Sequence, residues 1–154
     1  MKVGALLIAI LAGAFFAAAL ISTEQQSMQD LVGTTWELSH IQTADGTVLG
    51  VDRVEELLVF PDRGPNRLLF VTGCAETNVV YTPNGLGGDV VAATMTPTDG
   101  CSLQLMVNIW SLATRFWIEL GEDTLTLQAQ FRPEANVPDG LERVYTLRSS
   151  ASAG

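Results

Sequence analysis

The sequence predicts a mainly β domain with one helix (α+β), in which a curved antiparallel sheet or small barrel packs on that single helix. Three observations lead to this prediction. Short runs with alternating apolar and polar residues fill most of the chain, as expected of half-buried strands. Turn residues such as Asp45-Gly46 separate these runs. One stretch, residues 102–114, lacks glycine, proline and charge and repeats its large apolar residues at helical spacing.

The strands are predicted from their period-2 alternation. In the first of them, residues 31–41, Thr34, Trp36 and Leu38 alternate with Thr35, Glu37 and Ser39. Pro61 stops the second run, and glycine-rich turns separate those that follow. The remaining predicted strands are residues 54–60, 67–72, 77–82, 89–96, 124–131 and 141–148.

The helix is predicted from a stripe formed by Leu103, Met106, Trp110, Ala113 and Trp117, which recur at i, i+3, i+7, i+10 and i+14. Its end stays open, because residues 115–120 also have the character of a strand. With that segment counted, the tally is about eight strands and one helix, which is typical of a sheet or small barrel plugged by a helix.

The N-terminal segment is predicted to direct export. Lys2 precedes an uninterrupted apolar run over residues 3–21, and Ala17-Ala18-Ala19 offers a cleavage site. Residues 1–22 are therefore either a signal peptide or an N-terminal membrane anchor, and both place the rest of the chain outside the cytoplasm. Residues 23–30 are expected to be a linker, residues 31–148 one domain, and residues 149–154 a flexible tail.

The charge of the exported part excludes several partners. Lys2 is the only lysine, so that part carries 7 arginines (8 − 1) against 17 acidic residues, a net charge of about −10. Such a surface repels phosphate backbones and anionic lipids, and no basic stripe is present. We expect no nucleic-acid binding, and membrane contact only through an uncleaved N-terminal segment.

The two cysteines, Cys74 and Cys101, are expected to form a disulfide, since paired cysteines are the rule in exported domains. The bond closes a loop of 28 residues (101 − 74 + 1), which corresponds to about 3.6 kcal/mol in the chain-entropy relation. Two cysteines and one distant histidine fall short of the four ligands of a zinc site, so we predict no metal and no cofactor.

Five motifs in order resemble the META domain family of HslJ-like heat-shock and envelope proteins: LVGTTWELSHI (31–41), GCAETNVVY (73–81), TPTDGC (96–101), the apolar helix after it, and DTLTL (123–127). Ala75 stands where the family has asparagine, and the helix lacks the family's glutamate. The resemblance implies a compact β-rich domain with one helix, a location in the periplasm or on the outer face of the inner membrane, and a role in stress tolerance.

No residue pattern predicts catalysis. The single histidine, His40, has no nucleophile motif to partner it, and Glu55-Glu56 point to opposite faces of a strand. The large aromatic residues are expected to form either core or a small apolar pocket between helix and sheet. These candidates are Trp36, Trp110, Trp117 and Tyr81.

We therefore expect a non-enzymatic, exported META-like domain that acts in envelope stress tolerance by binding an envelope protein or a small apolar molecule. The alternative is a lipocalin-like carrier whose barrel holds a small ligand among the tryptophans. A pocket of a few hundred Å³ beside Trp36 and Trp110 would favour the carrier, whereas a filled interior with an exposed apolar patch would favour a protein partner.

Overall fold

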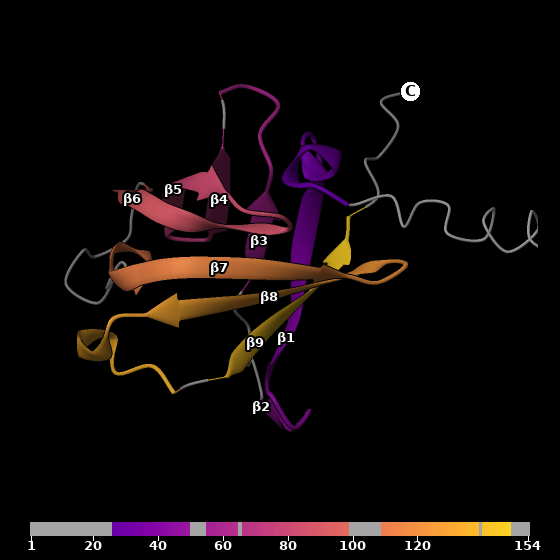
Figure 1. Cartoon of the computed structure of the whole chain (residues 1–154), viewed down its shortest axis with the longest axis vertical. Coiled ribbons are helices and arrows are strands. Elements are labelled where there is room, and N and C mark those ends of the chain that lie inside the picture. The colour runs from indigo at the N-terminus through magenta and orange to yellow at the C-terminus, as the bar shows by residue number, and fades with distance from the viewer. Residues whose placement is uncertain (1–25, 50–54, 65, 99–108, 139, 149–154) are drawn as a thin grey trace, which may run out of the picture.

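The computed structural model describes residues 26–49, 55–64, 66–98, 109–138 and 140–148. Nine strands in these residues form one antiparallel sheet in the order β2-β1-β3-β4-β5-β6-β7-β8-β9. Because β9 also pairs with β1, eight strands close into a barrel, and β2 lies outside it on the edge of β1. Figure 1 shows β6, β7, β8 and β9 in front, with β3, β4 and β5 receding behind them.

The strands run over the following residues: β1 (Thr35–Thr43), β2 (Val48–Leu49), β3 (Glu56–Val59), β4 (Arg67–Thr72), β5 (Ala75–Pro83), β6 (Gly87–Pro97), β7 (Ala113–Leu120), β8 (Thr124–Phe131) and β9 (Leu141–Leu147). Short 3-10 turns complete the described fold: η1 (Met28–Leu31), η3 (Ile109–Leu112) and η4 (Pro133–Ala135).

The predicted α+β class is wrong, because the described chain is an all-β barrel in which the helical elements are only 3-10 turns of three or four residues. Residues 109–112 form η3, and the chain from Ala113 onward is already β7. If residues 113–120 were helical, the backbone N–H and C=O groups on the facing edges of β6 and β8 would lack hydrogen-bond partners. As a strand, β7 supplies those partners to both neighbours. Residues 102–108 of the predicted helix lie outside the described residues.

The barrel interior is packed with side chains. Inward-facing positions alternate along each strand, and the buried side chains form one continuous cluster that includes Trp36 and Trp110. Trp110 stacks on Phe70 with ring centroids 4.3 Å apart, and Tyr81 meets Phe116 edge to face at 5.0 Å. The largest fully buried side chains are Tyr145, Phe60, Phe116, Leu58, Leu68, Leu125, Leu127 and Val79.

The barrel has two ends, which we name after the 3-10 turns beside them. At the η1 end, β1 begins just after η1, and Gly33 N donates a hydrogen bond of 2.7 Å to the Phe60 carbonyl just beyond β3. At the η3 end, β7 begins after η3, and Arg132 N donates a hydrogen bond of 2.8 Å to the Leu112 carbonyl. Met28 of η1 is buried in the core, so the folded body includes the residues just before position 31.

Candidate functional site

A pocket of about 470 Å³ lies at the η1 end of the barrel. This η1-end pocket lies between η1, the segment that joins β3 to β4, and the end of β5. Its size falls within the range of small-molecule sites. The lining residues are Ser27, Met28, Gln29, Val32, Phe60, Pro61, Asp62, Gly64, Asn66, Arg67, Tyr81 and Pro83.

Local sequence signals fix the walls of this pocket. Ser27 N donates a hydrogen bond of 2.8 Å to the Asp30 carboxylate, which anchors the first turn of η1. Asn66 has a left-handed backbone with φ 57°, which asparagine tolerates better than most residues, and its carbonyl accepts a bond of 3.0 Å from Tyr81 N. The pocket therefore has a defined backbone on both sides.

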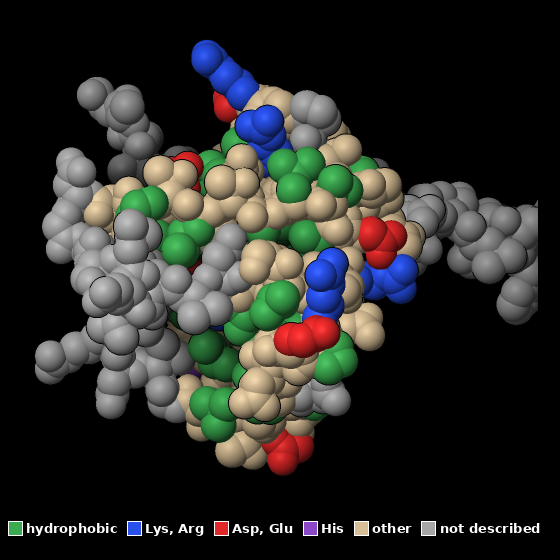
Figure 2. Space-filling view, turned by 90° about the vertical axis from the view of Figure 1, so that its left-hand side faces the viewer, with side chains coloured by type: hydrophobic (Ala, Val, Ile, Leu, Met, Phe, Trp, Pro, Cys, Tyr) green, Lys and Arg blue, Asp and Glu red, His purple; other side chains and the backbone are tan. Residues whose placement is uncertain are grey.

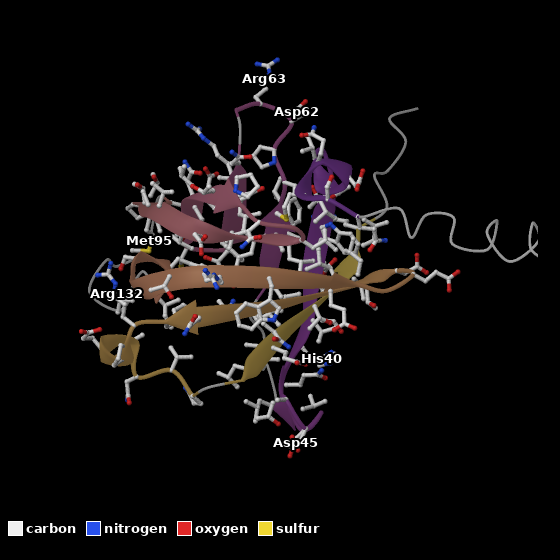
Figure 3. The ribbon with its side chains drawn as sticks, in the orientation of Figure 1. His40, Asp45, Asp62, Arg63, Met95 and Arg132 are labelled. Atoms are coloured by element: carbon white, nitrogen blue, oxygen red, sulfur yellow. The ribbon has the colours of Figure 1, made fainter. Side chains whose placement is uncertain are left out.

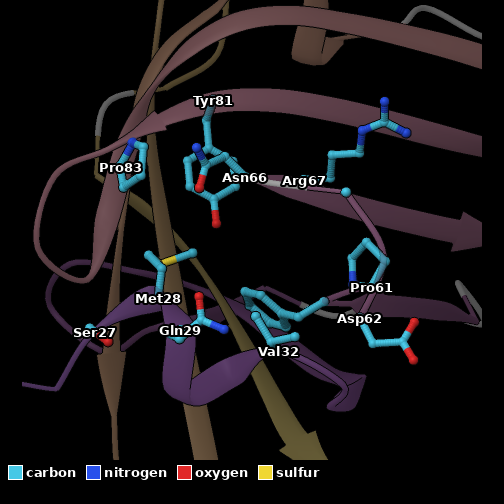
Figure 4. A pocket seen from close by; sticks show the side chains of 12 residues that line it. Ser27, Met28, Gln29, Val32, Pro61, Asp62, Asn66, Arg67, Tyr81 and Pro83 are labelled. Carbon is cyan, nitrogen blue, oxygen red and sulfur yellow. The ribbon is translucent and has the colours of Figure 1, made fainter.

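The η1-end pocket offers polar groups over an apolar floor. In Figure 4 the Tyr81 hydroxyl and the Gln29 amide face one another across the cavity, and Asn66 lies beside Tyr81. Arg67 and Asp62 extend outward on the same side of the opening. Burial raises the pKa of the Tyr81 phenol above its ordinary value of 10.0, so this hydroxyl stays neutral at neutral pH and can donate a hydrogen bond to a ligand.

A second, smaller pocket of about 100 Å³ lies at the η3 end. Its walls are apolar except for one guanidinium, that of Arg143. The lining residues are Ile41, Ile109, Trp110, Leu127, Ala129, Phe131, Val137, Leu141 and Arg143. Its volume is below that of an engineered core cavity that holds benzene, so it accommodates only a very small molecule.

A buried polar network underlies the η3-end pocket. Arg143 Nη1 lies 2.7 Å from both carboxylate oxygens of Glu56, and the Tyr145 hydroxyl donates a bond of 2.6 Å to Glu56 Oε1. Glu56 is only 7% exposed and Tyr145 is fully buried, whereas the Arg143 side chain is 28% exposed. Burial and the neighbouring Glu56 charge raise the pKa of Tyr145 well above 10.0, and the same carboxylate raises the pKa of Arg143.

The structure separates the four aromatic residues that the sequence singles out. Trp36 is buried in the core, and its Nε1 donates a 2.8 Å bond to Thr34 Oγ1. Trp110 is buried and lines the η3-end pocket, and Tyr81 is buried and lines the η1-end pocket. Trp117 lies on the outer face of β7 and is 42% exposed. Trp36 lines neither barrel-end pocket, so neither pocket brings Trp36 and Trp110 together.

The structure also locates the histidine and the adjacent glutamates that the sequence drew attention to. His40 lies on the outer face of β1, far from Asp62 and Arg63 at the opposite end of the molecule (Figure 3), and it lines neither barrel-end pocket. Glu56 points inward and Glu55 is exposed, as the strand period predicts. Cys101 lies outside the described residues, so its disulfide with Cys74 stays a prediction.

Sequence reasoning missed Arg143 and Tyr145 as partners of Glu56. A signal was present in the alternation of the strands. Glu56 lies two and four residues before the apolar, inward-facing Leu58 and Phe60, and Arg143 lies two residues before the inward-facing Tyr145. Charges of opposite sign on inward positions of two strands predict a buried ion pair once those strands lie in one barrel.

Other site classes find no support among the described residues. No group of three or more His, Cys, Asp and Glu side chains there is arranged to hold a metal ion. Lys and Arg side chains are few and scattered on the face shown in Figure 2. None of the described helical turns has the length and apolar character that a helix needs to cross a membrane. Residues 1–25, which carry the predicted export segment, lie outside the described ranges.

Comparison with known proteins assigns no family. No family model matches the chain, and no curated protein matches it. Among solved structures, the NMR structure of a protein from Burkholderia xenovorans aligns with a TM-score of 0.49 at 16% sequence identity, over 79% of this chain and 86% of that chain. Similarity at this level identifies neither a family nor a function.

Proposed function

We propose that this protein is an exported, non-enzymatic binding module that holds a small molecule in the η1-end pocket. The observation that carries the proposal is that pocket of about 470 Å³, which combines apolar walls with a few polar groups. Its ligand is an amphiphile: an apolar body contacts Met28, Phe60 and Pro83, and a polar group meets the amides of Gln29 and Asn66.

The closed barrel supports a carrier in general form, but the ligand position differs from that of a lipocalin. Tyr145, Phe116 and Leu58 are buried inside the barrel, so in the part of the chain that the structure describes the interior is occupied by side chains. In this protein the ligand binds at the end of the barrel beside η1, whereas in a hollow barrel it binds in the central cavity.

Binding rather than catalysis is proposed because the only histidine, His40, lines neither barrel-end pocket. Its ring nitrogens contact Ser39 Oγ and Gln42 Oε1 on the outer surface instead. The resemblance to META domains adds the proposed setting, which is stress tolerance in the bacterial envelope. Among the described residues, the exposed large apolar side chains come from β2, β6, β7, β9 and the segment after η1, so they single out no one element as a protein-binding site.

The experiment uses two asparagines that share an unusual backbone. Asn66 lines the η1-end pocket with φ 57°, and Asn136 has φ 50° after η4 and does not line that pocket. Glycine accepts this backbone at both positions, so Asn66→Gly removes an amide from the pocket without strain, and Asn136→Gly is the matched control. Both proteins and the wild type are purified from the native host and examined by native mass spectrometry.

We expect the wild type and Asn136→Gly to retain the same non-protein mass, and Asn66→Gly to lose most of it. An NMR screen of small aromatic amphiphiles should in parallel shift the side-chain amide signals of Gln29 and Asn66. Equal retention by all three proteins, or a screen in which no amphiphile moves those signals, contradicts the proposed site.

A further inference from the structure

A row of side chains crosses the outer surface of the barrel over five neighbouring strands. Val48 of β2 pairs with Gln42 of β1, Gln42 with Glu142 of β9, Glu142 with Gln128 of β8, and Gln128 with Trp117 of β7. We call these five residues the outer strip. With about 4.8 Å between strands, it is about 19 Å long.

Hydrogen bonds hold the polar residues of the outer strip in one arrangement. Trp117 Nε1 donates to Gln128 Oε1, Gln128 Nε2 donates to Glu142 Oε1, and Gln42 Nε2 donates to Glu142 Oε2 at 2.7 Å. The donors on both sides therefore point toward the Glu142 carboxylate. His40 extends the network, because its Nε2 lies 3.2 Å from Gln42 Oε1, an atom that only accepts.

This fixed arrangement leaves groups available to a ligand. Each glutamine amide uses one of its two N–H donors within the strip, and the Glu142 oxygens retain lone pairs. The hydrogen bond from Nε1 fixes the indole of Trp117 by its edge, and this residue is 42% exposed. Val48, at the other end of the outer strip, is 58% exposed. Since the side chains are already oriented, a ligand meets a smaller entropic cost on binding.

The charge of the outer strip indicates the class of ligand. Its single formal charge, on Glu142, already accepts a hydrogen bond from an amide on each side. Anions are repelled by this carboxylate and by the acidic exported part as a whole. A neutral, hydroxyl-rich chain is complementary: its C–H faces meet the electron-rich face of the indole, and its hydroxyl groups bind the amides and the carboxylate.

We propose that the outer strip binds an extended, uncharged, β-linked oligosaccharide laid across β7, β8, β9 and β1. A β-1,4-linked chain is an extended ribbon with apolar C–H faces and hydroxyl-bearing edges, which suits a straight row with an aromatic group at one end. The strip is separate from both barrel-end pockets, since none of its five residues lines either of them. The inference is independent of the proposed small-molecule site.

The test is a titration of the isotopically labelled protein, followed by NMR. Cellohexaose and N-acetylchitohexaose are the neutral β-linked probes, maltohexaose is the α-linked comparison, and hexagalacturonate is the anionic comparison. The proposal expects the β-linked probes to shift the Trp117 indole N–H signal and the side-chain amide signals of Gln42 and Gln128. The comparison sugars should bind at least tenfold more weakly.

The variants separate a binding role from a structural one. Trp117→Ala should weaken binding at least tenfold, and Trp117→Phe, which keeps an aromatic face, should weaken it less. Val91→Ala, which removes an exposed apolar side chain on β6 outside the strip, should leave the affinity unchanged. Melting curves of all variants verify folding. The proposal is overturned if neither β-linked probe shifts these signals at millimolar concentration, if maltohexaose binds equally well, or if Trp117→Ala binds like the wild type.

Discussion

Tyr145→Phe isolates one hydrogen bond inside the barrel. The phenol is fully buried, and its hydroxyl donates a 2.6 Å bond to the carboxylate of Glu56, which Arg143 also holds. Phenylalanine preserves the ring and removes only this donor. A hydrogen bond to a charged group contributes about 1.5–3 kcal/mol, and the low exposure of Glu56 excludes the water that might replace it. We therefore expect the free energy of unfolding to fall by about 2 kcal/mol at pH 7.

The measurement is chemical unfolding in urea, with the midpoint compared at constant m-value. Tyr81→Phe is the matched control, because Tyr81 is also buried in the core cluster and no group in the described chain hydrogen-bonds its hydroxyl. The control should lose less than about 0.5 kcal/mol. A loss below that level in Tyr145→Phe, or equal losses in the two variants, would refute the assignment of Tyr145 as a necessary partner of Glu56.

The loss of stability in Tyr145→Phe should also depend on pH. The pKa of Tyr145 is raised well above 10.0 in the folded state by burial and by the Glu56 charge, whereas the unfolded phenol titrates near its ordinary value. Stability from the neutral phenol is complete below pH 10 and is lost as pH rises toward the folded pKa. The difference between wild type and Tyr145→Phe should therefore shrink above pH 10, by at most about 1.4 kcal/mol per pH unit. A constant difference in alkaline urea titrations would contradict the buried position of the phenol.

Four further predictions test the core, a close backbone approach, a turn and the cysteines. Leu58→Ala, at a fully buried position, should lower the free energy of unfolding by about 2–5 kcal/mol in urea denaturation. Gly88→Ala should cost about 1–3 kcal/mol by the same assay, since its methyl group would lie 2.5 Å from an aromatic carbon and 2.7 Å from a carbonyl oxygen. The pKa of Asp45 is lowered by hydrogen bonds from the threonine side chain two residues before it and the threonine two residues after it, so an NMR titration should find it below 3.8. Its contribution to the turn is present above that pH and is lost as pH falls through the folded pKa. Alkylation without reductant should add no mass to Cys74 or Cys101, and two alkylated thiols would exclude the disulfide.

Strands with a clear alternation and strong turn signals were predictable from the sequence. The predicted ranges 67–72 and 124–131 coincide with β4 and β8, and residues 141–148 extend one residue beyond β9. In each case one face is apolar, and glycine, proline or asparagine lies close to at least one end of the strand. The two-residue strand β2 was not predicted, because two exposed apolar residues carry no period. The turn η1 was also missed, since its buried Met28 and Leu31 are too few to define a helical face.

The candidate site was largely beyond the reach of sequence patterns. The η1-end pocket joins Met28, Phe60 and Tyr81, which come from three separate segments and meet only when the barrel closes. Tyr81 was a candidate because it is aromatic and lies in a predicted strand, but its neighbour Asn66 gave no functional signal. Its left-handed backbone is a property of the turn and is visible only in three dimensions.

The failed helix prediction has a specific physical cause in residues 113–120. Ala113 and Trp117 fit a helical stripe, yet Phe116 and Ile118 alternate inward on β7, and Trp117 between them points to solvent. A short apolar run fits both the helical period of about 3.6 residues and the strand period of two residues, and local spacing does not decide between them. The decision comes from the backbone of the neighbouring strands, because β6 and β8 each need a partner on this side. The same choice turns Trp117 outward and aligns it with Gln128, so the closure of the barrel also creates the outer strip.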